Sequence, residues 1–175
     1  MKKANIEYLD FEIDKLTRSI ENVQTGDSFQ TDVRHLLKVD LKSVTKKQGW
    51  LFDWKEELAY DLREVYKLTI KENLSIIQGL ISIQVKEDHI FLSLIESAPF
   101  NIGKKKVYYG VPGNLVAFAC KLSFQKGFDG FVSFYAKTRL IEHYKKELLA
   151  NHIGGNTMVI NTTAAKALIE KYFKE

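Results

Sequence analysis

The sequence has few features that could cross-link it, kink it or bury it in a membrane: one cysteine, two prolines and no long apolar run. A single cysteine, Cys120, excludes an internal disulfide, as is typical of proteins from a reducing compartment. A membrane-spanning helix needs roughly 20 consecutive apolar residues, which the chain lacks. The first residues become acidic before any apolar run, unlike a signal peptide. We therefore expect a cytoplasmic protein without a membrane segment.

Motifs for metal binding and for several common chemistries are also missing. No metal-ligand spacing occurs among the four histidines, which are His35, His89, His143 and His152. The chain has no Walker motif, no nucleophilic serine elbow and no zinc signature, so we expect no metal. The net charge of +4 and the pI near 9.0 suit an anionic ligand. Because no basic–aromatic motif accompanies this charge, nucleic acid is not an expected partner.

The length and composition allow one sizeable core, because 45% of the 175 residues are hydrophobic and 12% are aromatic. No repeat, low-complexity tract or linker divides the sequence. We expect a single domain over residues 1–175, with residues 65–160 as its core and residues 1–60 on the side of an acceptor substrate.

The first 60 residues give mixed signals. Apolar residues spaced by three and four from Ile6 to Ile20 fit one face of a helix. We predict a strand or turn near residues 6–10 and then a helix to about Val23. Tyr8 and Phe11 also fit a short first strand. Residues 40–47 predict a short exposed helix that stops at Gly49, and residues 56–63 predict a loop or short helix. The aromatic patch over residues 50–54 fits either packing beneath a sheet or one wall of an acceptor site.

Three strands are predicted next, over residues 65–70, 76–85 and 89–95, because apolar and polar residues alternate there. Gly79 marks a bulge in the second strand. The linkers are short enough for hairpins, so the three strands form an antiparallel meander.

A βαβ unit follows the meander. Residues 114–126 predict a buried helix that ends at Gly127, and residues 131–136 predict a strand parallel to the one that ends at Glu96. The helix N-terminus carries unpaired N–H groups and a partial positive charge, which suit a phosphate. An amphipathic helix over residues 140–149, a strand over 158–161 and a last helix over 164–173, capped by Thr162 or Thr163, complete the chain.

This order of elements resembles the GNAT family of acyl-CoA N-acyltransferases over roughly residues 65–160. Members have a turn before the cofactor helix with Gln or Arg, two residues, Gly, one residue, and Gly or Ala. Residues 107–113 here read VYYGVPG, so Gly110 matches the first glycine, while Val107 and Pro112 depart from the pattern and Gly113 follows. The run from Glu96 to Asn101 before the turn, and the later LIEHY at residues 140–144, also fit the family.

The resemblance implies an α/β (α+β) fold: a mixed sheet with an antiparallel meander, a βαβ acyl-CoA-binding unit and helices on both faces. It also implies acetyl-CoA as co-substrate. The backbone of Leu94 and Ile95, where the strand parts from its parallel neighbour, would pair with the pantetheine amides. The expected donors to the pyrophosphate are the N–H groups of Gly110, Val111, Gly113, Asn114 and Leu115. Lys104, Lys105 and Lys106 either attract the phosphates or form a solvated loop.

Two residues are candidates for proton transfer. Glu96 is the expected base for the acceptor amine, with a structural carboxylate that holds the Asn101 segment as the alternative. Tyr144 is the expected acid for the leaving thiolate, with a core tyrosine as the alternative. His143 is predicted to point to another face of the helix than Tyr144. Cys120 is predicted to be buried and inert.

The sequence thus predicts an N-acetyltransferase in which an amine of an acceptor, a small molecule or a protein, attacks acetyl-CoA directly. The alternative is a catalytically silent GNAT-like module that recognises a protein partner, which the departures at Val107 and Pro112 favour. The acceptor carries no readable motif, and the oligomeric state stays open, a homodimer included.

Overall fold

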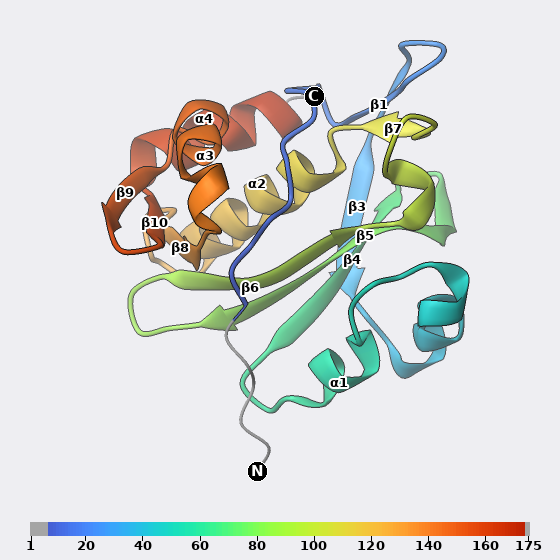
Figure 1. Cartoon of the computed structure of the whole chain (residues 1–175), viewed down its shortest axis with the longest axis horizontal. Helices are drawn as coiled ribbons and strands as arrows, with labels where there is room; N and C mark the ends of the chain where they lie inside the picture. Colours follow the sequence, from blue (N-terminus) through green and yellow to red (C-terminus); the bar gives the residue numbers. More distant parts are fainter. Residues whose placement is uncertain (1–6, 174–175) are drawn as a thin grey trace.

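The computed structural model describes residues 7–173, and its centre is a seven-stranded mixed sheet (Figure 1). All neighbouring strands pair antiparallel except β6 and β8, which are parallel. The expected mixed sheet with an antiparallel meander is therefore confirmed. In spatial order the strands are β3 (Thr31–His35), β4 (Glu64–Ile70), β5 (Asn73–Val85), β6 (Ile90–Ser97), β8 (Val132–Tyr135), β10 (Thr157–Ile160) and β9 (Asn151–Gly154).

Side chains that alternate along the strands give the sheet two buried faces. On β5, Ile81 and Ile83 point into a large core with Leu115 of α2, whereas Leu80 points into a smaller core with Trp54 of α1. Figure 1 shows α2, α3 and α4 on one side of the sheet and α1 on the other, so the expected helices on both faces are confirmed. The helices are α1 (Trp54–Ala59), α2 (Val111–Gln125), α3 (Ile141–Glu147) and α4 (Thr162–Phe173).

The bulge predicted at Gly79 is confirmed and brings α2 onto the sheet. Leu68 of β4 pairs with Gly79, but the next residue of β4 pairs with Ile77, so one residue of β5 has no counterpart on β4. A Cβ atom at Gly79 would lie 2.7 Å from the Cγ1 atom of Val111. The glycine therefore lets the first turn of α2 approach the strand closely.

The prediction of a helix to about Val23 is wrong, because residues 7–19, here called the N-terminal segment, contain no helix. The strand or turn expected near residues 6–10 agrees with the β-bridge that Leu9 forms. The segment runs extended beside the sheet and leads into β1 (Ile20–Asn22), which pairs with β2 (Ser28–Phe29) and β7 (Tyr108–Tyr109) in a small second sheet. Leu9 and Ile13 are buried, whereas Leu16 is 40% exposed. The spacing of four between Leu9 and Ile13 fits a strand as well as a helix, and here the strand geometry prevails. Ile6 lies outside the described residues.

Several smaller predictions are corrected by the structure. The short helix expected over residues 40–47 is two 3₁₀ helices, η1 (Lys38–Ser43) and η2 (Lys46–Gln48), and Gly49 ends the second one with a φ of 104°. Asn161, not either threonine, caps α4, because its side chain accepts from the N–H of Ala164 at 3.0 Å. Strand β9 was not predicted, because its residues are exposed and leave no apolar pattern. Two further 3₁₀ helices are η3 (Pro99–Asn101) and η4 (Thr138–Leu140).

Gly113 offers a test of how tightly α2 and α4 pack. Replacing a helical glycine with alanine ordinarily stabilises a protein by about 1 kcal/mol. A Cβ atom at Gly113, however, would lie 1.8 Å from the hydroxyl oxygen of Tyr172. We expect Gly113→Ala to lower the free energy of unfolding by about 2 kcal/mol in urea denaturation. In a Tyr172→Leu background the same substitution should cost almost nothing, and an equal cost in both backgrounds would contradict this packing.

Candidate functional site

The candidate site begins where the parallel strands β6 and β8 part. Their pairing covers two residue pairs, Ile90 with Val132 and Phe91 with Ser133. Beyond them β6 continues to Ser97 and pairs with β5 alone, through Leu94 and Ile95 among others. We call this place the β6–β8 divergence. The two residues predicted to hold pantetheine through their backbone therefore lie on the strand that leaves its parallel neighbour.

The N-terminus of α2 lies at the same end of the sheet. Gly110 is the N-cap, with a φ of 93° that favours glycine. The N–H of Asn114 already donates to the carbonyl of Gly110 at 2.9 Å, so this predicted donor is committed to the helix, and Leu115 lies one residue further in and is fully buried. Since Pro112 has no N–H, the donors of the first turn are the N–H groups of Gly110, Val111 and Gly113.

Tyr144 projects from α3 toward the N-terminal segment. Its hydroxyl donates to the carbonyl oxygen of Phe11 at 2.6 Å, and its ring contacts the rings of Phe11 and Phe134. The side chain has no exposed surface, and burial raises the pKa of Tyr144 well above its usual range. The hydroxyl is therefore protonated at neutral pH, as a proton donor must be.

Glu96 lies on the opposite face of the sheet from Tyr144. Its carboxylate accepts from the N–H of Leu51 at 2.6 Å, from the N–H of Phe52 at 3.3 Å and from Nε1 of Trp54 at 2.8 Å. It is 5% exposed. Glu96 therefore holds residues 51–54 against the sheet, not the Asn101 segment. The aromatic patch is buried at both tryptophans, as the packing interpretation predicts.

The N-terminal segment occupies the β6–β8 divergence. The N–H of Leu9 donates to the carbonyl of Tyr135 at 2.7 Å, and the N–H of Lys137 donates to the carbonyl of Leu9 at 3.0 Å. Leu9 and Ala136 thus form a parallel bridge at the end of β8. In Figure 1 this segment is the dark blue trace that rises past β6 toward the end of α4.

Two polar side chains tie the rest of the segment to the same site. The N–H of Ile13 donates to Nε2 of His143 at 2.9 Å, so His143 faces the segment as Tyr144 does, and the prediction that it points elsewhere is wrong. The Asp14 carboxylate accepts from the N–H of Gly110 at 3.1 Å and from Nζ of Lys106 at 3.0 Å. Sequence reasoning missed Asp14 and His143 because their partners lie about a hundred residues away.

A cavity of about 90 Å³ lies next to Leu94 on the α1 face. Four of its lining residues carry carboxylates and one carries a guanidinium, that of Arg63, which pairs with Glu57. An acidic wall of this kind suits a cationic amine. The lining residues are Glu7, Phe52, Asp53, Glu56, Glu57, Tyr60, Arg63 and Leu94.

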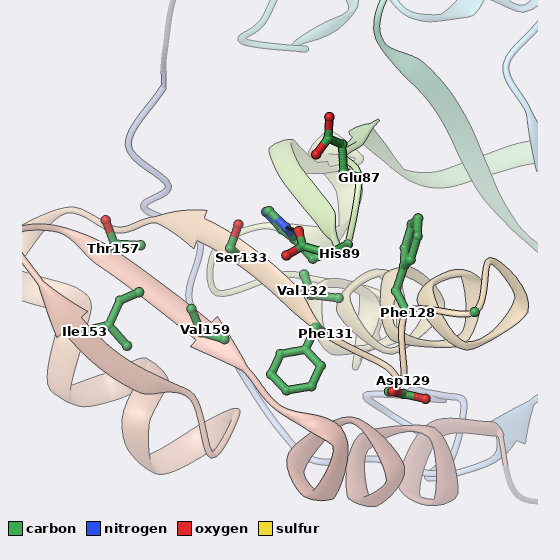
Figure 2. A pocket seen from close by; sticks show the side chains of 12 residues that line it. Glu87, His89, Phe128, Asp129, Phe131, Val132, Ser133, Ile153, Thr157 and Val159 are labelled. Atoms are coloured by element: carbon green, nitrogen blue, oxygen red, sulfur yellow. Dashed lines mark hydrogen bonds and ion pairs between the residues drawn. The ribbon is translucent and has the colours of Figure 1, made fainter.

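A larger cavity, of about 700 Å³, lies elsewhere (Figure 2). Figure 2 shows Ser133 of β8 and Val159 of β10 beneath it, with His89 and Phe128 at its edge. Ser133 alternates with Phe134, which contacts Tyr144 on the other face, so this cavity is separated from the candidate acid by the sheet. Its lining includes Val132 and Ser133, where β8 is still paired with β6, but neither Leu94 nor Ile95.

Within residues 7–173, no group of three or more His, Cys, Asp or Glu side chains is arranged to hold a metal ion. In the same part of the chain, no helix is both long and apolar enough to cross a membrane.

No family model and no curated protein matches the chain. Solved structures do match. A chimera of the spermidine N-acetyltransferase SpeG from Vibrio cholerae and hSSAT has a TM-score of 0.53 at 14% identity, over 78% of this chain and 98% of that chain. The spermidine/spermine N-acetyltransferase SpeG from Vibrio cholerae in complex with manganese ions has a TM-score of 0.53 at 13% identity, over 79% and 96%. The chain has the GNAT fold.

A third match is the KacTA–DNA complex, with a TM-score of 0.54 at 11% identity, over 79% of this chain and 98% of that chain. Identity in all three matches lies between 11% and 14%, so the likeness is one of fold. Because one match is a complex with DNA, the expectation that nucleic acid is not a partner of this GNAT fold stays a prediction.

The three donors around Glu96 predict a large effect on stability. Glu96→Gln keeps the shape of the side chain but replaces one acceptor oxygen by an NH₂ group, which would face N–H donors in a buried site. We expect a loss of about 2–4 kcal/mol in the free energy of unfolding, measured by urea denaturation. Glu142→Gln is the matched control, since that side chain is 85% exposed. A Glu96→Gln protein as stable as the control would show that the carboxylate is not structural.

Cys120 provides a second test of the core. It is fully buried on α2, and burial raises the pKa of its thiol to about 12. Only about one thiol in ten thousand is then ionised at pH 8. We expect iodoacetamide to leave the folded protein unmodified over hours and to modify Cys120 readily in 6 M guanidinium, as read by intact mass. Rapid modification of the folded protein would contradict the buried position.

Proposed function

We propose that this protein is an acetyl-CoA-dependent N-acetyltransferase that acetylates an amine of its acceptor by direct attack. One observation carries the proposal. A single extended segment contacts the end of β8, the hydroxyl of Tyr144 and the N-terminus of α2 in succession, through Leu9, Phe11 and Asp14. The three features therefore line one continuous path. The SpeG matches, which are N-acetyltransferases, support the same interpretation.

In this proposal the path holds acetyl-CoA with its pyrophosphate at Gly110, Val111 and Gly113 and its thioester at Tyr144. Backbone N–H groups and the helix dipole favour a phosphate at the turn. Lys106, beside the turn, adds a positive charge, whereas Lys104 and Lys105 are exposed. The backbone of Leu94 and Ile95 lies along the part of β6 that β8 leaves unpaired, where the pantetheine amides would bond.

The reaction requires one bond to form and one to break. The neutral amine attacks the thioester carbonyl, the C–N bond forms, and the C–S bond breaks as the thiolate leaves. Tyr144 gives its hydroxyl proton to that thiolate and regains a proton from the amine through solvent. Three N–H donors already hold the Glu96 carboxylate in place. We therefore propose that Glu96 keeps residues 51–54 in position beside the site and takes no part in proton transfer.

The acidic cavity beside Leu94 supports a cationic amine as the acceptor. It lies on the face of the sheet away from Tyr144, lined by residues of the 52–63 region, and Phe52 connects it to Glu96. An acceptor that enters there would approach the thioester from the side opposite to the α2 core. This arrangement puts residues 52–63 on the acceptor side, whereas residues 9–14 lie along the cofactor path.

A second candidate function is a catalytically silent GNAT-fold module that recognises a protein partner. The observation that favours it is that the chain's own N-terminal segment uses both the Tyr144 hydroxyl and the N–H of Gly110. The departures from the family turn at Val107 and Pro112 point the same way. Such a module would show no turnover on any amine.

Acetyl-CoA should bind only the folded protein and raise its melting temperature. A ligand at 100 times its Kd contributes about 2.7 kcal/mol, which corresponds to several degrees for a chain of this length. We expect such a shift in differential scanning fluorimetry with acetyl-CoA and a smaller one or none with ATP at equal concentration. The absence of a shift with any CoA species would argue against an acyl-CoA site.

Tyr144→Phe separates catalysis from binding. We expect this variant to lose about 100-fold in kcat on an amine panel, because it cannot protonate the thiolate, while its affinity for acetyl-CoA does not fall. Tyr66→Phe is the matched control, since Tyr66 is also a buried tyrosine with a raised pKa but lies on β4. Equal turnover in the wild type and Tyr144→Phe would remove the assignment. Acetyl-CoA binding without turnover in the wild type would favour the silent module.

A further inference from the structure

We propose that the N-terminal segment is an internal competitor of acyl-CoA, docked along the path that the cofactor takes and released when the cofactor binds. This inference rests on the proposed function and adds its regulation. Three independent contacts carry it: one to the edge of β8, one to Tyr144 and one to the turn before α2.

The backbone contact lies on the edge of β8 that faces β6. The carbonyl of Ala136 accepts from the side chain of Asn156 at 2.7 Å, and the N–H of Ala136 donates to the carbonyl of Asn156 at 2.8 Å. Both backbone groups of Ala136 therefore point toward β10. Groups of neighbouring residues point to opposite edges of a strand. Tyr135 and Lys137 therefore present their groups to the β6 side, and Leu9 pairs with them there. The segment thus takes the place beside β8 that β6 has left.

The contact to Tyr144 lies at the thioester end of the path. The Phe11 carbonyl accepts from the Tyr144 hydroxyl at 2.6 Å, and the Phe11 ring packs on the Tyr144 ring with centroids 5.1 Å apart. While this bond exists, the hydroxyl has no proton to offer a leaving thiolate. Docking of the segment and proton transfer by Tyr144 are therefore mutually exclusive.

The contact to the turn lies at the phosphate end. Asp14 places an anionic carboxylate at the N-terminus of α2, with one oxygen on the N–H of Gly110 and the other on Nζ of Lys106. The same groups favour a phosphate. Thr17 fills the space beside Gly110, since a Cβ atom at Gly110 would lie 2.0 Å from the Oγ1 atom of Thr17. The glycine that the family turn uses for close approach of a ligand is here in contact with the chain itself.

The order of these contacts matches the order of groups in the cofactor. Along the segment Phe11 comes before Asp14, just as the thioester lies at one end of the pantetheine arm and the pyrophosphate at the other. Two further carboxylates pair with cations at the rim: Asp10 with Lys137 at 2.9 Å and Glu12 with Arg139 at 3.8 Å. These exposed pairs add little energy, but they give the segment the negative charge of the ligand that it replaces.

Competition of this kind has a quantitative consequence. If acyl-CoA binds only when the segment is released, its apparent Kd is the intrinsic Kd divided by the released fraction. Leu9 and Ile13 are buried in the main core, so docking is strongly favoured and the released fraction is small. Anything that holds the segment down must weaken acyl-CoA binding, and anything that loosens it must strengthen binding.

A reversible cross-link tests this directly in the full chain. Tyr8 and Tyr135 are adjacent to the bridge of Leu9 with Ala136, and their rings lie 6.0 Å apart. The spacing of neighbouring strands matches the Cα separation of a disulfide, so Tyr8→Cys with Tyr135→Cys should lock the segment. Cys120 does not interfere because it is buried. Acetyl-CoA affinity is measured by isothermal titration calorimetry on the oxidised form and, in the phosphine reductant TCEP, on the reduced form.

The oxidised form should bind acetyl-CoA at least about 30-fold more weakly than the reduced form, which is its own control. Equal affinity in the two forms would overturn the competition while leaving the acyl-CoA site intact. Binding to neither form, nor to the wild type and Asp14→Asn, would overturn both this inference and the proposed function. The two failures are therefore distinguishable.

Asp14→Asn tests the phosphate end without a cross-link. It removes the charge that pairs with Lys106 and with the helix N-terminus, so the segment should dock less firmly and the apparent Kd for acetyl-CoA should fall about 3- to 10-fold. Asp61→Asn is the matched control, an exposed residue after α1 that removes the same charge. An unchanged or weaker affinity in Asp14→Asn, relative to Asp61→Asn, contradicts a phosphate-like role for the Asp14 carboxylate.

Discussion

The structure depends on the fact that two parallel strands pair over only two residues and then part. Beyond Phe91 and Ser133, β6 has lost its neighbour on one side, and the end of β8 faces the space that this leaves. Buried backbone groups must be hydrogen-bonded, and an unpaired sheet edge attracts another extended chain. Whatever lies in the β6–β8 divergence must therefore be extended and must carry hydrogen-bonding groups. An N-terminal segment and a pantetheine arm both satisfy that requirement.

The same constraint explains why features from distant parts of the sequence meet here. The crossover helix α2 begins next to the divergence because its first turn packs on Gly79 of β5. The helix after β8 then brings Tyr144 over the gap, and α4 closes the far side with Tyr172 against Gly113. Glu96, at the end of β6, anchors the segment around Trp54 to the other face. The site is thus a consequence of one splayed strand pair, supported on both faces of the sheet.

Much of the fold could be predicted from the sequence where apolar residues recur regularly over a long stretch. The strands that contain Leu68 and Ile81 and the buried helix that contains Leu115 lie close to their predicted positions, because buried apolar side chains recur there at a regular spacing. The extended conformation of the N-terminal segment could not be predicted, since the spacing of Leu9 and Ile13 fits a strand as well as a helix. Pairing with the edge of β8, more than a hundred residues away, selects the strand. For the same reason no local signal could place Asp14 on Gly110 or His143 on Ile13.

Whether the N-terminal segment and acyl-CoA share one place can be read most directly from amide hydrogen exchange. The N–H groups of Leu9 and Ile13 are bonded to Tyr135 and His143, so both should exchange slowly in the free protein. Saturating acetyl-CoA should make these two amides exchange faster while the amides of β4 and β5 stay protected. If acetyl-CoA binds and the amides of Leu9 and Ile13 remain as protected as before, the segment is a permanent strand of the fold and does not compete with the cofactor.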